Sequence, residues 1–203
     1  MTSWTSWRLK RGMAMLQIDD PKPLYGATAR LFLRRLRPAD LVAYCRCYQC
    51  AETMDYIGRP LSVAAASASF AEAVKRQDEP WAGPGARLRI AISSNEHTEL
   101  EGLLAVDGCS SPYTAEVGVL LQHSLRGRGM AHEALGALIQ RLEQMGVLRT
   151  QLRADPRNEA MLRLASRLDF TAQRLESVDM ATVIYRRHGD LVQHNQSGGR
   201  HLP

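Results

Sequence analysis

The chain has 203 residues, of which 45% are hydrophobic and 23% charged, a composition typical of one globular domain with a normal core. Its 26 basic and 21 acidic residues leave a net charge of +5, which suits an anionic ligand but does not by itself indicate nucleic acid. No apolar run reaches membrane-spanning length, and the N-terminus lacks the apolar segment of a secretory signal. We therefore expect a cytoplasmic protein that does not enter a membrane.

The two ends of the chain differ from its middle. Residues 1–26 show no hydrophobic period and contain Asp19, Asp20 and two prolines, so we predict a flexible N-terminal extension. Residues 189–203 are polar and rich in glycine, and they are predicted to be a disordered tail. The folded domain is accordingly expected to span residues 27–188.

The first part of this domain is predicted to form a strand and two helices. Leucines alternate over residues 30–36, which is typical of a half-exposed strand, and Pro38 then opens a helix. Ser62 is predicted to cap a second helix that ends near Lys75. The inner face of the first helix is expected to consist of Leu41, Tyr44, Cys45 and Tyr48.

Strands and helices then alternate to the end of the domain. Residues 78–85 hold two prolines and two glycines and are predicted to be a loop. Apolar residues recur at helical spacing from Met130 to Met145, and a shorter helix follows a turn at residues 155–158. The remaining segments are predicted to be strands, at residues 87–92, 100–106, 115–121, 148–154, from 170 onward and at 180–187.

Four cysteines lie at positions 45, 47, 50 and 109. The spacing of the first three resembles a metal motif, but a helix would direct Cys45 and Cys47 to different sides, and no second pair of ligands is nearby. We therefore expect no metal, and reduced thiols that are buried or half-buried.

The stretch at residues 115–131 predicts a binding site for phosphate. A buried strand interrupted by Gly118 leads into the turn Arg126-Gly127-Arg128-Gly129, and a helix follows at once. The first N–H groups of a helix have no partner within it, and glycines let the backbone approach an anion closely. Two other interpretations stay open, namely a solvated basic turn and an arginine–glycine segment that contacts RNA.

The same stretch resembles a known family. Arg126, Gly129 and Ala131 fit the (Gln/Arg)-x-x-Gly-x-(Gly/Ala) signature of the GNAT superfamily of acetyl-CoA-dependent N-acetyltransferases. The longer segment looks like the branch named for ribosomal-protein N-terminal alanine acetyltransferases. This resemblance implies an α/β (α+β) fold, with a mixed central sheet of about seven strands, about four helices, and two central strands that splay apart.

The resemblance also implies which residues bind acetyl-CoA, the acetyl donor. Val119 and Leu121 would offer backbone groups to the pantetheine arm and the thioester, and Asn158 would hydrogen-bond that arm. Asn158 is equally suited to cap the helix that follows it. The pyrophosphate would be held by Arg126, Gly127, Arg128, Gly129, Met130 and Ala131.

Two residues are candidates for catalysis. Glu116 matches a glutamate common in this branch and could act as the base, or it could simply pair with an arginine at the end of the strand. The position of the family's proton-donating tyrosine is Ala165 here, which leaves the neighbouring Ser166 as a poor substitute. Glu133, in the first turn of the helix after the glycine turn, is expected to be structural.

The expected reaction is direct transfer of an acetyl group to a primary amine, either a protein N-terminus or a small molecule, by a monomer or homodimer. Met161 and Asp169 also depart from the family's serine and glycine. These departures keep a second possibility open, a non-catalytic module that binds acyl-CoA.

Overall fold

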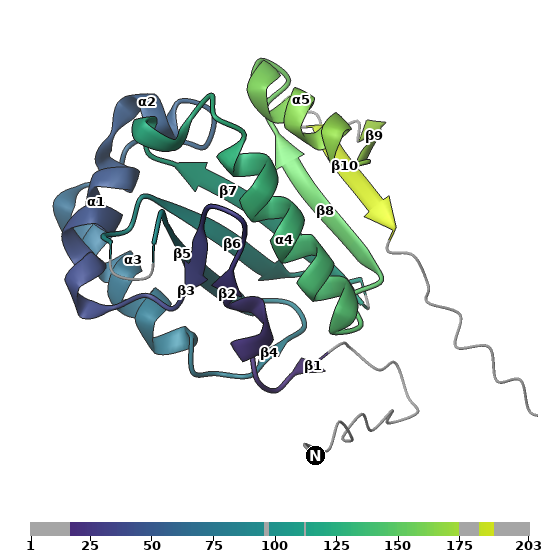
Figure 1. Cartoon of the computed structure of the whole chain (residues 1–203), viewed down its shortest axis with the longest axis horizontal. Coiled ribbons are helices and arrows are strands. Elements are labelled where there is room, and N and C mark those ends of the chain that lie inside the picture. The colour runs from purple at the N-terminus through teal and green to yellow at the C-terminus, as the bar shows by residue number, and fades with distance from the viewer. Residues whose placement is uncertain (1–16, 96–97, 112, 175–182, 189–203) are drawn as a thin grey trace, which may run out of the picture.

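The computed structural model describes residues 17–95, 98–111, 113–174 and 183–188 (Figure 1). The strands are β1 (Gln17–Ile18), β2 (Gly26–Ala27), β3 (Phe32–Arg34), β4 (Trp81–Ala82), β5 (Arg87–Ser93), β6 (Gly102–Gly108), β7 (Thr114–Leu121), β8 (Arg149–Ala154), β9 (Thr171–Arg174) and β10 (Val183–His188). The α-helices are α1 (Leu41–Gln49), α2 (Ala51–Met54), α3 (Val63–Arg76), α4 (Met130–Gln144) and α5 (Glu159–Arg167). Short 3₁₀ helices are η1 (Lys22–Leu24), η2 (Pro38–Asp40) and η3 (His123–Leu125).

Within the described residues, eight strands form one mixed sheet in the order β2-β3-β5-β6-β7-β8-β10-β9, and β1 pairs with β4 apart from it. Neighbouring strands of the sheet are antiparallel except β7 and β8, which are parallel. The predicted α+β class is confirmed. The sheet has one strand more than expected because the two-residue β2 joins its edge, and the helices number one more because α2 follows α1 separately.

Helices cover both faces of the sheet. The larger hydrophobic core joins α4 and α5 to one face, and a second core joins α1 and α3 to the other (Figure 1). On β7 the side chains of Ala115 and Val117 enter the larger core, while Leu120 enters the second core. The alternation of β7 therefore directs Glu116 and Gly118 to the same face as Leu120.

The periodicity of the two long helices is confirmed. The predicted stripe of α4 is buried along its whole length, from Met130 through Leu138 to Met145. Ser62 caps α3 through a 3.2 Å hydrogen bond from the N–H of Ala65 to its Oγ.

The predicted inner face of α1 is partly wrong. Tyr44 and Cys45 are buried, but Leu41 is 38% exposed, and Ala43 and Cys47 are buried in its place. Ala43, Tyr44 and Cys47 face the second core, so the buried stripe is turned around the helix axis relative to the expected one, and Leu41 lies outside it.

The predicted N-terminal extension is also partly wrong. β1 pairs antiparallel with β4, with Ile18 opposite Trp81, and Leu24 of η1 is 1% exposed. Residues 17–26 therefore pack against the domain, because Ile18, Leu24 and Trp81 bury one another's apolar surface in the larger core. Residues 1–16 and the predicted tail at 189–203 lie outside the described residues.

Asp169 has a left-handed backbone conformation, with φ of 59°. It follows α5, at a place where helices often end on glycine because an L side chain is strained there. Asp is one of the few other residues that tolerate this conformation. The backbone of Asp169 therefore has the left-handed conformation that the family's glycine would adopt at this position.

No described helix is long and apolar enough to cross a lipid bilayer.

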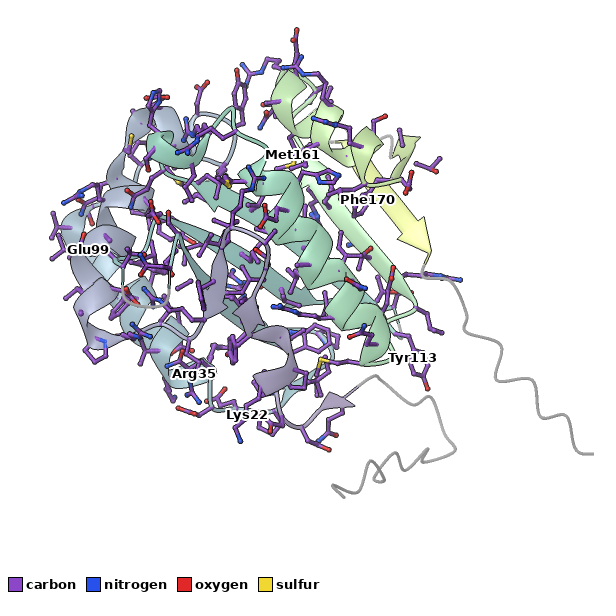
Figure 2. All side chains as sticks on the ribbon, viewed as in Figure 1. Lys22, Arg35, Glu99, Tyr113, Met161 and Phe170 are labelled. Carbon is purple, nitrogen blue, oxygen red and sulfur yellow. The ribbon has the colours of Figure 1, made fainter. Side chains whose placement is uncertain are left out.

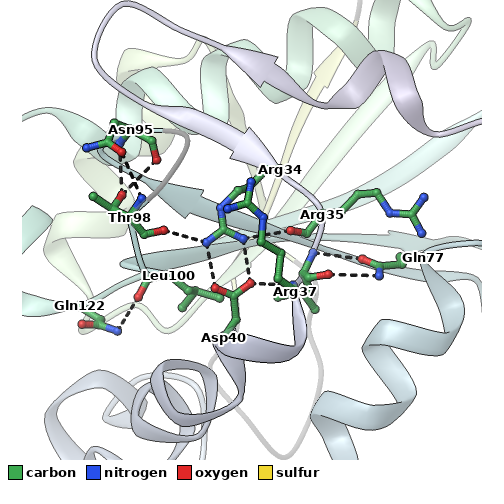
Figure 3. A network of polar contacts seen from close by, with 10 residues as sticks. Arg34, Arg35, Arg37, Asp40, Gln77, Asn95, Thr98, Leu100 and Gln122 are labelled. Atoms are coloured by element: carbon green, nitrogen blue, oxygen red, sulfur yellow. Dashed lines mark hydrogen bonds and ion pairs between the residues drawn. The ribbon is translucent and has the colours of Figure 1, made fainter.

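A buried ion pair joins β3 to the start of α1 (Figure 3). Arg34 donates from both terminal nitrogens to the two oxygens of Asp40, at 2.7 and 2.8 Å, and one of them also donates to the carbonyl of Thr98. Burial tends to raise the pKa of Asp40, but hydrogen bonds from Arg34 and from the N–H of Arg37 outweigh it and hold the pKa below its usual value.

We expect Asp40→Ala to reduce the free energy of unfolding by about 3–5 kcal/mol, because it leaves the guanidinium of Arg34 buried without its charge partner. Asp78→Ala is the matched control, since it removes the exposed partner of Arg35 and should cost less than about 1 kcal/mol. Urea unfolding of the two variants measures both values. Equal losses would show that the buried pair has no special role.

The same pair should depend on pH. Since the pKa of Asp40 is lower in the folded protein than in the unfolded one, its carboxylate stabilises the fold fully above about pH 4, and this stabilisation is lost as the pH falls further. The difference in stability between the wild type and Asp40→Ala should therefore narrow as the pH falls below about 4.

Candidate active site

The two central strands of the sheet separate after a short pairing. β7 and β8 are in register at only three positions, the last joining Glu116 to Gln151, although β7 continues to Leu121. β8 pairs with β10 over its whole length, and β7 stays paired with β6. Figure 1 shows the two strands diverging toward the end where α5 begins. The predicted splay is thus present.

The backbone of β7 beyond Glu116 presents hydrogen-bonding groups to this gap. The N–H of Gln122 donates to Glu101 on the β6 side, whereas the carbonyl of Tyr113 accepts from Arg149 on the β8 side. Antiparallel pairing alternates these directions residue by residue, so the backbone groups of Val119 and Leu121 point away from β6. These are the two residues that the family resemblance implied for the pantetheine arm.

The turn between η3 and α4 has the predicted glycine geometry. Gly127 and Gly129 have φ of 70° and 77°, in the left-handed region, and Gly129 is the N-cap residue of α4. No side chain caps the helix. Within the described part of the chain, the N–H groups of residues 127–132 have no hydrogen-bond acceptor. Six consecutive free donors at the positive end of a helix are suited to bind phosphate oxygens.

The two arginines of the turn differ in their surroundings. Arg126 points its guanidinium at α2 and the end of β7, donating to Glu52 at 2.9 Å, Thr53 at 3.0 Å and the carbonyl of Leu121 at 3.0 Å. Its own N–H donates to His123. The side chain of Arg126 is therefore engaged in holding the turn, while Arg128 is exposed.

Arg30, which no sequence pattern indicated, lies beside the turn. Arg30 donates to the carbonyl of Arg128 at 3.1 Å and to Glu133 at 2.7 Å, and Glu133 also accepts from the N–H of Arg30 and from Thr28. The structural role expected of Glu133 is confirmed by these contacts. Arg30 and Thr28 lie 103 and 105 positions before Glu133 in the sequence, and no local pattern joins them to it.

Glu116 is held from one side only. Its Oε2 accepts from Gln151 at 3.0 Å and from Arg153 at 2.8 Å. Its Oε1 accepts no hydrogen bond from any described residue. Burial raises the pKa of the Cys109 thiol, and the nearby carboxylate of Glu116 raises it further. The ion pair that the sequence left open is present, and one oxygen stays free to accept a proton.

The residues predicted on α5 take different positions. Asn158 caps the helix, its Oδ1 accepting from the N–H of Met161 at 3.0 Å, which leaves its amide N–H groups to donate elsewhere. Figure 2 shows Met161 on the side of α5 that faces α4. Ala165 is fully buried, and Ser166, about 100° further around the helix, is exposed. The structure thus turns Ser166 toward solvent rather than into the core.

The metal-like cysteine motif forms free thiols. Cys45 and Cys47 are buried, and Cys50 and Cys109 are half-buried. Among the described residues, no group of three histidine, cysteine or acidic side chains is arranged to hold a metal ion.

The family model described as "Acetyltransferase (GNAT) domain" matches residues 30–171. The chain therefore belongs to the GNAT acetyltransferase family. No curated protein matches the sequence closely enough to count as a relative.

Solved structures share the fold. An acetyltransferase from Agrobacterium tumefaciens str. C58 is 24% identical, over 81% of this chain and 94% of that one, with a TM-score of 0.67. RimL, a ribosomal L7/L12 alpha-N-protein acetyltransferase in complex with coenzyme A, is 19% identical over 82% and 98%, with a TM-score of 0.66. The ribosomal-protein-S5-alanine acetyltransferase from Vibrio fischeri is 11% identical over 82% and 97%, with a TM-score of 0.66.

We expect Gly129→Glu to abolish binding of coenzyme A, because it places bulk and negative charge beside the free N–H groups. Gly85→Glu is the matched control, since Gly85 also has a left-handed φ, of 87°, with open space around it. Both variants carry the same backbone strain, of about 1–2 kcal/mol. Isothermal titration calorimetry measures the binding, and equal affinities for both variants would remove the turn from the site.

Proposed function

We propose that the protein is an acetyl-CoA-dependent N-acetyltransferase that transfers the acetyl group directly to a primary amine. The observation that carries this proposal is the row of free N–H groups at residues 127–132 beside the unpaired edge of β7. The two features suit the two ends of acetyl-CoA, the pyrophosphate and the pantetheine arm. The coenzyme A bound to RimL, a protein of the same fold, supports this choice of ligand.

Different residues of the site would bind the pyrophosphate and the pantetheine arm of acetyl-CoA. The turn and the start of α4 would hold the pyrophosphate through Gly127, Arg128, Gly129, Met130 and Ala131. Val119 and Leu121 would bind the pantetheine arm in the gap, and the free amide of Asn158 would donate to it. A backbone N–H facing the gap could also stabilise the thioester carbonyl as negative charge develops on its oxygen.

Glu116 is the proposed base. It shares a face of the sheet with Gly118, two residues and about 7 Å along the strand, where the missing side chain leaves room for the acceptor. Arg153 and Gln151 fix one oxygen of Glu116, so that Oε1 can take a proton from the amine, directly or through water. The departing thiolate would receive its proton from solvent.

The acceptor is proposed to approach from this same face. Asp107 lies directly opposite Glu116 in the register of β6 and β7, and Arg89 pairs with it at 2.6 Å. Arg89 and Arg153 already offset the charges of Asp107 and Glu116, so an amine would be recognised by donating a hydrogen bond to the free Oε1 of Glu116. Both a protein N-terminus and a small-molecule amine meet this requirement, and two of the similar structures are named for ribosomal-protein substrates.

One observation favours a second function, a non-catalytic module that binds acyl-CoA. The position of the expected proton donor is the fully buried Ala165, and the adjacent hydroxyl of Ser166 faces solvent. Such a module would use the same turn and the same gap, but it would release no thiol.

Thermal unfolding with and without acetyl-CoA, followed by detection of free thiol with a panel of amines, tests the proposal. At about a hundred times its Kd, acetyl-CoA should add about 2.7 kcal/mol and raise the Tm by about 5–10 °C. Thiol release with one class of amine would establish the enzyme. A shift without release from any amine would favour the binding module, and the absence of a shift would refute both functions.

We expect Glu116→Gln to lower kcat at least about a hundredfold while the Kd for acetyl-CoA stays unchanged, because the base is lost and the binding groups are not. Asp20→Asn, which removes an exposed carboxylate paired with Lys22, is the control and should change neither value. An unchanged kcat in Glu116→Gln would assign the residue a structural role.

A further inference from the structure

Arg30 lies against the glycine turn although it belongs to another part of the chain. It sits between β2 and β3, and this hairpin runs beside α4 (Figure 1). One terminal nitrogen of its guanidinium donates to the carbonyl of Arg128 at 3.1 Å. The other lies 3.6 Å from the point where a Cβ on Gly129 would stand, so the guanidinium faces the middle of the turn.

Glu133 fixes Arg30 in this place. Its carboxylate, which is 14% exposed, accepts from the Nε of Arg30 at 2.7 Å, from the N–H of Arg30 at 2.7 Å and from the Oγ of Thr28 at 2.5 Å. Burial tends to raise the pKa of Glu133, but these hydrogen bonds outweigh it and lower the pKa. The carboxylate therefore stays charged, and it ties the hairpin to the first turn of α4.

The contact at Arg128 determines the direction of the next amide. No described peptide bond is cis, and in a trans peptide the N–H points opposite to the carbonyl oxygen. We propose that Arg30 is a positioning residue for coenzyme binding, which holds the carbonyl of Arg128 and so directs the N–H of Gly129 away from the hairpin, to the phosphate. This inference rests on the proposed function and adds a residue to it.

The hydrogen bond from Arg30 to the carbonyl of Arg128, called the clamp from here on, lowers the free-energy cost of ordering the turn when the ligand binds. Gly127 and Gly129 give the turn its left-handed geometry, but glycine also allows many other backbone conformations, which a ligand would have to restrict. A guanidinium that already holds the peptide between the arginine and Gly129 removes part of that cost before the ligand arrives. Arg30 thus acts on affinity through the turn.

The test compares the Kd for coenzyme A in the wild type, Arg30→Met and Arg35→Met by isothermal titration calorimetry. Arg35 is the matched control, because it loses the same charge and an ion pair with Asp78, and Figure 2 shows it near Lys22, away from the turn. We expect Arg30→Met to bind roughly tenfold more weakly, and Arg35→Met to bind within about twofold of the wild type. A wild type that fails to bind coenzyme A would refute the proposed function. A wild type that binds, with Arg30→Met equal to Arg35→Met, would refute the clamp alone.

Two further measurements separate positioning from direct contact with phosphate. The amide resonance of Gly129 in ¹⁵N-labelled protein should move in Arg30→Met before any ligand is added. Glu133→Gln, which loosens Arg30 without touching the turn, should weaken binding by a smaller factor than Arg30→Met, and it serves as the test if Arg30→Met does not fold. Two results together would overturn the clamp in favour of a direct charge contact with phosphate. Arg30→Lys would bind coenzyme A with the wild-type Kd, and the Gly129 resonance would not move in Arg30→Met.

Discussion

The site depends on one constraint, the end of the parallel pairing between β7 and β8 after Glu116 and Gln151. An unpaired strand edge inside a sheet normally costs free energy, because backbone donors and acceptors lose their partners. Here each strand keeps a full ladder on its other side, β7 with β6 and β8 with β10, so the sheet tolerates the opening. The groups left over on β7 are then available to a ligand, and α4 begins where they end.

The sequence predicted the elements whose signals are local. The strand at β7, the stripe of α4, the cap at Ser62 and the turn geometry at Gly127 and Gly129 follow from spacing and residue type within about fifteen positions. The cap at Asn158 followed in the same way. The family resemblance supplied the splay, which no local pattern encodes.

The other features of the fold and the site could not be predicted from local sequence, because they depend on contacts between residues that are distant in the chain. Glu133 was correctly expected to be structural, but its partner Arg30 is 103 positions away, and nothing near either residue points to the other. The side chain of Arg126 was expected at the phosphate, yet its hydrogen bonds to α2 are equally remote in sequence. The inner face of α1 was only partly predicted, because residue spacing within the helix does not show which side meets the second core. The packing of Ile18 could not be predicted, because its partner strand β4 consists of two residues within a segment that was predicted to be a loop.

The guanidinium of Arg126 connects α2 to the end of β7. It donates hydrogen bonds to Glu52 and Thr53 of α2 and to the carbonyl of Leu121. Met54 of α2 lies in the second core, on the face of β7 from which the acceptor is proposed to approach, and Leu121 is proposed to bind the coenzyme arm. Thermodynamic linkage is reciprocal, so any ligand that shifts α2 through this guanidinium changes the affinity at the end of β7, and a ligand there shifts α2 by the same free energy. In the proposed transfer reaction, the affinity for one substrate would then depend on the presence of the other, and this dependence would be carried by the side chain of Arg126.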